Sequence, residues 1–287
     1  MSRRITTKLP NPDGVAAGGT ATFRIPVGRR IHNLYFLFAY NASTQNVSHF
    51  TEFRVYLNGQ VIQRFSGVQR DTLNQYDRLP ASSTAGILQI PFDRVRMLTL
   101  AGQEETAINT ASLNEQTGLK ISSVYMEVDI AGGATIGASD LTLYAEESDS
   151  VPGGPGTIPY LRNEIRSVAG ADDDFQISDL VNPGVNAPDK VALARITFVP
   201  SSGALTRLRV DRNNYSVFDR TDALNRNIQN GGIRTAQSGY YSIDTGERGH
   251  GGNVIDLFGM TDFRYRLSAS AAMDITCLSE YLGVLSG

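Results

Sequence analysis

The feature that most constrains this chain is a repeat, because its second half restates the turn, helix and strand signals of the first. Three landmarks recur in the same order, at a spacing of 151 to 155 residues. They are Asn58-Gly59 with Asn213-Asn214, residues 71–74 with 222–225, and residues 86–90 with 239–243. A repeat of this length predicts two copies of one domain.

The length of the chain agrees with a duplication. Its 287 residues accommodate two domains of about 140 residues each. The Pro/Gly-rich segment at 152–156 would interrupt any helix or strand, because proline lacks an amide donor and glycine weakens regular structure. We therefore expect an N-terminal domain at 1–151, a hinge at 152–159 and a C-terminal domain at 160–287.

Apolar and polar residues alternate over many short segments, such as 21–27, 124–130 and 263–269. This alternation is typical of antiparallel strands with one face on a core. Short strands separated by glycine, proline and asparagine favour a β-sandwich. The sequence therefore predicts an all-β fold made of two sandwiches.

Each half also predicts one short helix after a hairpin. In the first half Ser66 begins a capping box that starts a helix over 67–78. In the second half Thr221 caps a helix over 222–229. We expect Leu224 and Ile228 to face inward from this second helix.

The sequence shows no recognisable catalytic site, so we expect no enzyme and no required cofactor. The three histidines lack metal-binding spacing, and the single Cys277 lies in an apolar run typical of a buried thiol. The acidic run at 172–174 is expected in a loop before a strand. Asp172 and Asp174 are calcium candidates because their carboxylates are hard oxygen ligands, and a solvated turn is the alternative.

The charge of the chain excludes a broad nucleic-acid-binding face, because the net charge is −3 and is shared evenly between the halves. Arginine supplies 23 of the 26 basic residues. Protein interfaces favour arginine over lysine, so this choice indicates a surface covered by partners, with biased genomic composition as the alternative.

One local basic cluster lies near the start of the chain, at Arg3, Arg4 and Lys8. Its residues are candidates for contact with an anionic lipid surface, and a mobile, solvated terminus is the alternative. No signal-peptide pattern follows, and no apolar run approaches the roughly 20 residues that span a bilayer. We therefore expect a soluble protein made in a cytoplasm.

Several motifs, in order along nearly the whole chain, resemble those of corticovirus-type major capsid proteins. They are residues 9–20 (LPNPDGVAAGGT), 27–32 (VGRRIH), 58–64 (NGQVIQR), 90–94 (IPFDR), 152–156 (PGGPG), 262–267 (DFRYRL) and 280–283 (EYLG). The resemblance implies a double jelly-roll, in which two eight-stranded sandwiches carry a short helix in a loop of each.

The resemblance also implies a function. Three chains would form a homotrimer of pseudo-sixfold outline, and trimers would tile the icosahedral shell of a tailless, membrane-containing bacterial virus. The implied partners are further copies of the chain, minor capsid and vertex proteins and the internal membrane, with no specific nucleic acid. Bound calcium is known in the family, but neither calcium ligands nor a catalytic motif can be carried over to residues here.

The sequence therefore predicts a structural major capsid protein of the virion shell, synthesised in a host bacterial cytoplasm. Two alternatives stay open. One is a carbohydrate-binding or carbohydrate-active jelly-roll protein, against which the absence of tryptophan counts. The other is a minor vertex or spike protein, which would differ from a shell protein in copy number.

Overall fold

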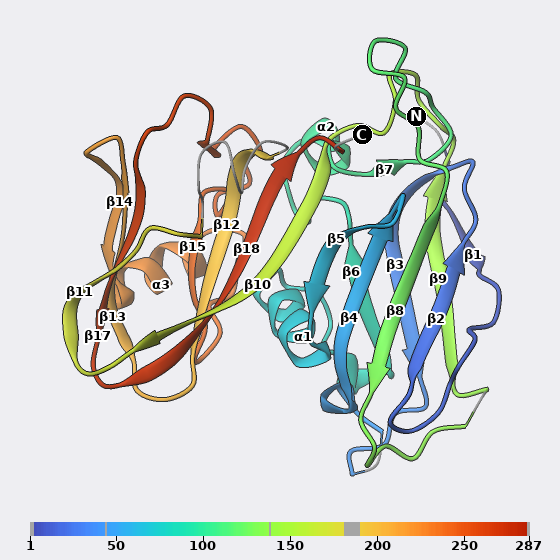
Figure 1. The fold of residues 1–287 in the computed structure, drawn as a ribbon, viewed down its shortest axis with the longest axis horizontal. Coiled ribbons are helices and arrows are strands. Elements are labelled where there is room, and N and C mark those ends of the chain that lie inside the picture. Colours follow the sequence, from blue (N-terminus) through green and yellow to red (C-terminus); the bar gives the residue numbers. More distant parts are fainter. Residues whose placement is uncertain (1–2, 44, 138, 181–189, 286–287) are drawn as a thin grey trace. The chain divides into compact units, whose positions relative to one another are not determined.

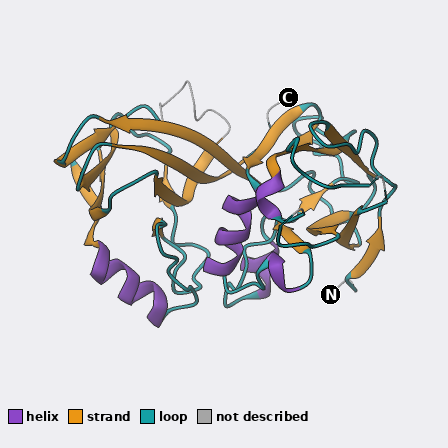
Figure 2. Ribbon diagram, turned by 90° about the horizontal axis from the view of Figure 1, so that it is seen from below, coloured by secondary structure: helices purple, strands orange, loops and turns teal. Residues whose placement is uncertain are grey.

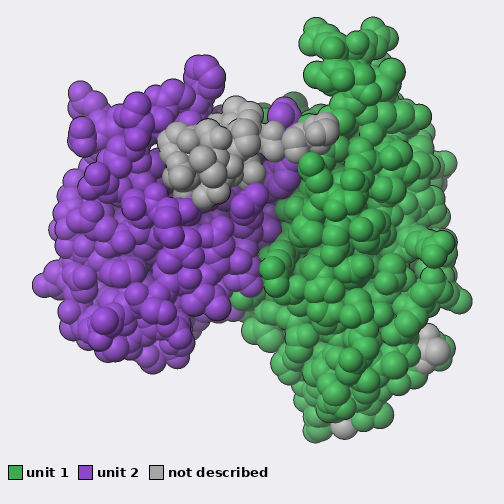
Figure 3. Space-filling view, viewed as in Figure 1, with its two compact units in different colours: residues 1–159, 285–287 green, residues 160–284 purple. Residues whose placement is uncertain are grey.

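The computed structural model describes residues 3–43, 45–137, 139–180 and 190–285. The chain divides into two compact units, residues 1–159 with 285–287 (unit 1) and residues 160–284 (unit 2), which are coloured separately in Figure 3. The segment at 152–157 forms bends and coil, and the next strand begins at Ile158. No helix in the described residues is long and apolar enough to cross a bilayer.

Unit 1 contains two antiparallel sheets (Figure 1). In its described residues the first has the order β1 (Ile5–Lys8), β9 (Leu141–Ser148), β3 (Arg30–Phe38), β6 (Ile87–Pro91), and β7 (Ile108–Asn109) pairs with β3. The second has the order β5 (Gln60–Phe65), β4 (Phe50–Leu57), β8 (Val124–Ile130), β2 (Thr20–Ile25). The helices α1 (Gly67–Tyr76) and α2 (Leu100–Glu104) and the 3₁₀ turns η1 (Val47–His49) and η2 (Ser82–Thr84) connect these strands.

Unit 2 repeats this arrangement. Within it, one sheet has the order β10 (Ile158–Val168), β18 (Met273–Gly283), β12 (Lys190–Pro200), β15 (Tyr241–Asp244), and β16 (Ile255–Asp256) pairs with β12. The other has the order β14 (Tyr215–Thr221), β13 (Leu205–Arg212), β17 (Phe263–Ala269), β11 (Asp172–Ile177). The helix α3 (Asp222–Gly231) follows β14 as α1 follows β5. Matching strands thus occupy matching places, which confirms the predicted duplication and the double jelly-roll.

Aromatic side chains fill the core between the sheets of unit 1. Phe36 lies at the centre, with ring centroids 4.9 Å from Phe50, 5.2 Å from Phe53 and 5.8 Å from Phe23, all edge to face. In unit 2, Tyr265 is edge to face with Phe198 at 5.6 Å. Alternating strands therefore bury one face each, as the period-two pattern predicts.

The predicted helices are confirmed in position, and Figure 2 shows how few helices the fold contains. The helix α1 has the predicted Ser66–Gln69 capping box, and α3 is capped by Thr221. The predicted inward face of α3 is wrong, because Leu224 is 49% exposed and Ile228 is only partly buried. Asn225 and Gln229 are buried instead, and both donate to the Ser242 carbonyl at 2.7 Å. These two hydrogen bonds hold α3 against β15 through the helix face that carries Asn225 and Gln229.

Candidate functional site

Arg4, just before β1, lies among carboxylates of unit 1. Its Nη2 is 2.8 Å from both Asp93 Oδ2 and Glu104 Oε1, and its Nη1 is 3.4 Å from Glu146 Oε1. Burial is the largest single influence on the Glu104 carboxyl and opposes its ionisation, but the hydrogen bond to Arg4 and the nearby charges, among them Arg4 and Arg30, together outweigh burial and lower the pKa of Glu104. The guanidinium therefore ties the N-terminal strand to three distant segments.

The other two residues of the basic cluster differ from Arg4 in their exposure. Arg3 and Lys8 are exposed, whereas the side chain of Arg4 is only 28% exposed. Arg4 is therefore held in ion pairs, whereas Arg3 and Lys8 are accessible to solvent.

The acidic run at 172–174 does not form the predicted loop, because it is the first half of β11. Asp174 forms an ion pair with Arg266 on β17, and the Ser268 hydroxyl donates to the Asp173 carbonyl at 2.8 Å. These contacts draw the segment into the sheet. Hydrogen bonding to Arg266 lowers the pKa of Asp174, so this carboxylate stays ionised and paired.

The run at 172–174 does not fit a calcium ion as the structure places it. Asp172 accepts from the Asp174 amide at 2.8 Å, and a cation, Arg266, already holds the Asp174 carboxylate. Searched across the described residues, no group of three or more His, Cys, Asp or Glu side chains is placed to hold a metal.

A hydrogen-bonded set of Ser148, His32 and Asp93 lies inside unit 1. His32 Nε2 is 2.8 Å from Ser148 Oγ, and Nδ1 is 3.0 Å from Asp93 Oδ1. These are the partners of a serine-hydrolase triad. His32 is 0% and Ser148 2% exposed, so a substrate cannot reach the hydroxyl.

The corresponding place in unit 2 has different residues. His32 is the extra residue where the β3–β9 register shifts, and Ala194 is the extra residue where the β12–β18 register shifts. The carbonyls of both accept from the strand segment that follows the helix, His32 from the Phe92 amide and Ala194 from Thr245. The register shift therefore occurs in both units, whereas the hydrogen-bonded set of Ser148, His32 and Asp93 occurs at this place in unit 1.

The first asparagine of each hairpin turn, Asn58 or Asn213, makes side-chain hydrogen bonds that were not predicted from the sequence. Asn58 (φ 50°) accepts at Oδ1 from the Ser122 amide at 2.8 Å, and Asn213 (φ 48°) accepts from the Thr261 amide at 2.8 Å. Their left-handed backbone confirms the predicted hairpin turns. The recurrence of asparagine at a spacing of 155 residues was the signal that could have indicated a shared role.

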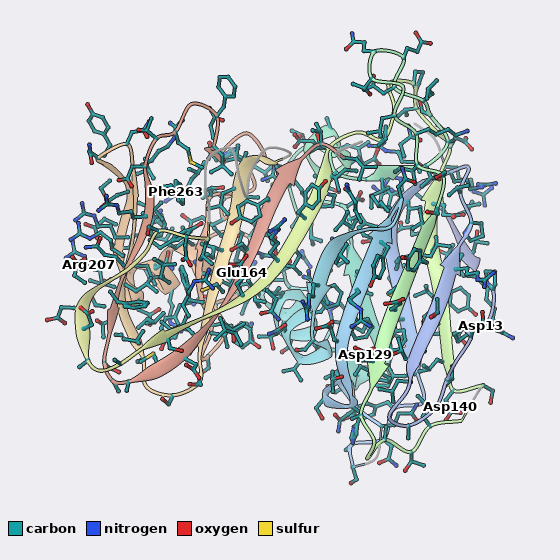
Figure 4. The ribbon with its side chains drawn as sticks, in the orientation of Figure 1. Asp13, Asp129, Asp140, Glu164, Arg207 and Phe263 are labelled. Atoms are coloured by element: carbon teal, nitrogen blue, oxygen red, sulfur yellow. The ribbon has the colours of Figure 1, made fainter. Side chains whose placement is uncertain are left out.

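The β5–β4–β8–β2 sheet of unit 1 and the β14–β13–β17–β11 sheet of unit 2 bear arginine–carboxylate pairs between neighbouring strands, and Figure 4 labels Asp129 and Arg207 among them. Arg54 on β4 lies 2.7 Å from Asp129 and 3.1 Å from Glu127 on β8. In unit 2, Arg207 on β13 lies 2.6 Å from Asp219 on β14. Such ion pairs connect the side chains of adjacent strands across the sheet surface.

Two jelly-rolls of identical topology in one chain define a protein of the double jelly-roll class. Two family models match the chain, the viral coat protein P2 N-terminal domain over residues 6–148 and the P2 C-terminal domain over residues 165–285. The chain therefore belongs to the viral coat protein P2 family, and it is a major capsid protein of the virion shell.

Solved structures share the fold. The major capsid protein P2 of bacteriophage PM2 superposes with a TM-score of 0.81 at 18% identity, covering 99% of this chain and 98% of that one. The major capsid protein of STIV gives 0.67 at 11% identity, with 98% and 97% covered. The PBCV-1 capsid gives 0.59 at 10% identity, with 98% and 94% covered.

No curated protein sequence matches the chain. Neither family model, nor any of these three structures, is that of a carbohydrate-active or vertex protein.

Proposed function

We propose that the chain forms homotrimers of pseudo-sixfold outline that tile the icosahedral shell of a tailless, membrane-containing bacterial virus. The observation that carries this proposal is the equal strand order of the two units. Three chains with two like lobes each present six similar lobes, which suit a hexagonal lattice. Minor capsid and vertex proteins would complete the shell.

The mass of the purified protein in solution tests the trimer. Light scattering should give three times the chain mass of 31.1 kDa, about 93 kDa. A particle that stays at the mass of one chain over the whole accessible concentration range would contradict the proposal.

We propose a structural role without catalysis. Burial of Ser148 and His32 supports this, because nucleophilic catalysis needs a hydroxyl that the substrate can reach. Ester hydrolysis by the purified protein that disappears in Ser148→Ala, with the trimer intact, would overturn it.

We propose that Arg3 and Lys8 contact the anionic surface of the internal membrane. Both are exposed, and lysine or arginine near such a surface contributes about 1 kcal/mol each. Flotation of the protein with anionic vesicles should fall in the double variant Arg3→Glu/Lys8→Glu. The matched control is Arg24→Glu, whose side chain is 81% exposed. Equal loss in the control would sink the assignment.

We propose that the fold and the trimer need no calcium. The pairing of Asp174 with Arg266 supports this, since an ion would have to displace the arginine. The test is given among the predictions below.

A further inference from the structure

The segment that links the two jelly-rolls, residues 151–156, lies against unit 1, to which it belongs. We call this segment the linker. Gly154 and Pro155 in its middle are buried, and all three of its glycines have a positive φ. Because buried backbone polar groups are nearly always hydrogen-bonded, this burial requires partners for the linker backbone.

Asn109, the last residue of β7, binds the linker through both its backbone and its side chain. Its side-chain amide donates to the Val151 carbonyl at 2.6 Å and to the Gly154 carbonyl at 3.0 Å. Its Oδ1 accepts from the Ser150 hydroxyl at 2.8 Å, and its backbone amide donates to the Pro155 carbonyl at 3.2 Å. Asn109 is 1% exposed, so its side-chain donors and acceptor are used on the linker and on the residue just before it.

Gly154 is held by two more residues of the same connection. Its amide donates to the Ser112 hydroxyl at 3.0 Å. A Cβ added to Gly154 would lie 2.7 Å from the Asn114 Cβ, closer than two carbon atoms can approach. The backbone of Gly154, with φ 90°, therefore fits against Asn114 only without a side chain.

The residues that bind the linker are anchored in the sheet of unit 1. Asn109 pairs with Arg30 on β3. The hydroxyl of Thr110 accepts from the Gly28 amide at 2.8 Å and donates to the Arg29 carbonyl at 2.7 Å. The linker therefore packs on a part of the jelly-roll that is itself hydrogen-bonded to a central strand.

This contact surface lies where unit 1 is longer than unit 2. Residues 92–123 join β6 to β8 in unit 1, whereas the shorter stretch 245–262 joins the matching strands β15 and β17 in unit 2. Connections that differ between like domains are where functional residues are usually found. The jelly-roll that the linker follows is thus the one with the longer connection.

We propose that the longer connection of unit 1 is a binding site for the linker, with Asn109 as its positioning residue. We call Asn109, Ser112 and Asn114 the linker seat. The seat holds the linker so that every copy of the chain leaves unit 1 at one point. A fixed linker has less freedom to lose on assembly, so the seat should favour the trimer. This consequence rests on the proposed trimer, whereas the seat itself does not.

Hydrogen exchange of the linker tests the seat. The Gly154 amide should exchange slowly in the wild-type chain, because it is buried and hydrogen-bonded. Asn109→Ala removes the donor of two linker carbonyls, so this amide should exchange at least about tenfold faster. Circular dichroism reports whether the variant is folded. Unchanged exchange in the folded variant would overturn the proposal.

Two glycine variants give a matched test that keeps Asn109 in place and applies even if Asn109→Ala does not fold. Gly154→Ala brings its Cβ against Asn114 and should speed exchange of the linker at least about tenfold. Gly153→Ala is the control, because φ is 110° but, chain neighbours aside, no described atom lies within 4 Å of its Cβ position. Equal effects of both variants would show that backbone strain, not the seat, governs the linker.

Light scattering over a dilution series separates the seat from the trimer. Asn109→Ala should need a concentration at least about threefold higher than wild type to trimerise, since its freed linker must be ordered again. A variant with fast linker exchange that trimerises like wild type would overturn the role of the seat in assembly. A wild-type chain that stays monomeric with a slowly exchanging linker would overturn the trimer and leave the seat.

Discussion

Asn74 and Asn225 make the same pair of contacts in the two jelly-rolls. Each donates its side-chain amide over 2.7 Å to a carbonyl of the next strand, Asn74 to Gln89 and Asn225 to Ser242. Each also accepts from an arginine, Arg70 at 2.9 Å or Arg220 at 3.2 Å. The repeated DTLN and DALN segments therefore carry a clamp between helix and sheet.

Replacing Asn74 should destabilise unit 1. In Asn74→Ala the Gln89 carbonyl and Arg70 Nε lose a partner in a buried place, which costs about 1–3 kcal/mol of unfolding free energy. Val68→Ala, at a position of α1 where the side chain is 43% exposed, should change it by no more than about 0.5 kcal/mol. Chemical denaturation measures both, and equal effects would refute the clamp.

The first hairpin residue combines a backbone and a side-chain effect that variants can separate. Asn58→Gly keeps the left-handed backbone but loses the hydrogen bonds to Ser122 and Lys120. Asn58→Ala also loses these hydrogen bonds. In addition it places an alanine in the left-handed backbone conformation, which costs roughly 1 kcal/mol. We expect stability to fall in the order wild type, glycine, alanine, as read from denaturation midpoints. An alanine variant at least as stable as the glycine variant would exclude backbone strain.

Arg54 should stabilise unit 1 at neutral pH but not in acid. Hydrogen bonding to Arg54 lowers the pKa of Asp129 below its ordinary 3.8. A lowered pKa adds stability above 3.8 that is lost as pH falls through the folded value. Arg54→Met should lower the unfolding free energy by about 0.5–1 kcal/mol at pH 7, because the ion pairs that it removes are partly exposed to solvent.

The difference between Arg54→Met and wild type should shrink below pH 3.8. Arg24→Met, on an exposed side chain 3.8 Å from Asp13, is the control and should change little at either pH. A difference that is constant with pH would show that packing, not charge, explains the effect.

Removing calcium should not change the protein. Because Arg266 already holds Asp174, a chelator should leave both the melting temperature and the trimer mass as they were. Differential scanning calorimetry with and without added calcium checks this. A melting temperature that rises by several degrees with calcium would reveal a site elsewhere in the chain.

Local signals predicted much of this fold. Alternation, the Asn58-Gly59 turn and the Ser66 cap depend on neighbouring residues, so the strands, hairpins and helices could be placed from sequence. The short helix α2, which Thr99 caps, has no counterpart among the helices predicted from the sequence.

Side-chain environments set by distant segments could not be predicted in this way. Leu224 looked inward by apolar character, but the strand beneath α3 offers a carbonyl, which selects Asn225. Arg4 was a candidate for contact with a lipid surface, and its ion pairs could not be predicted because Asp93, Glu104 and Glu146 come from three separate segments. Both depend on contacts that only the folded chain brings together.

The buried set of Ser148, His32 and Asp93 has a consequence for how enzymes are recognised. A template that matches three side chains by interatomic distance would sort this coat protein with the esterases. What separates the two is access of water and ligand to one oxygen atom, a property that the template does not encode. Triad geometry is therefore a sound criterion only when solvent exposure of the nucleophile is scored with it.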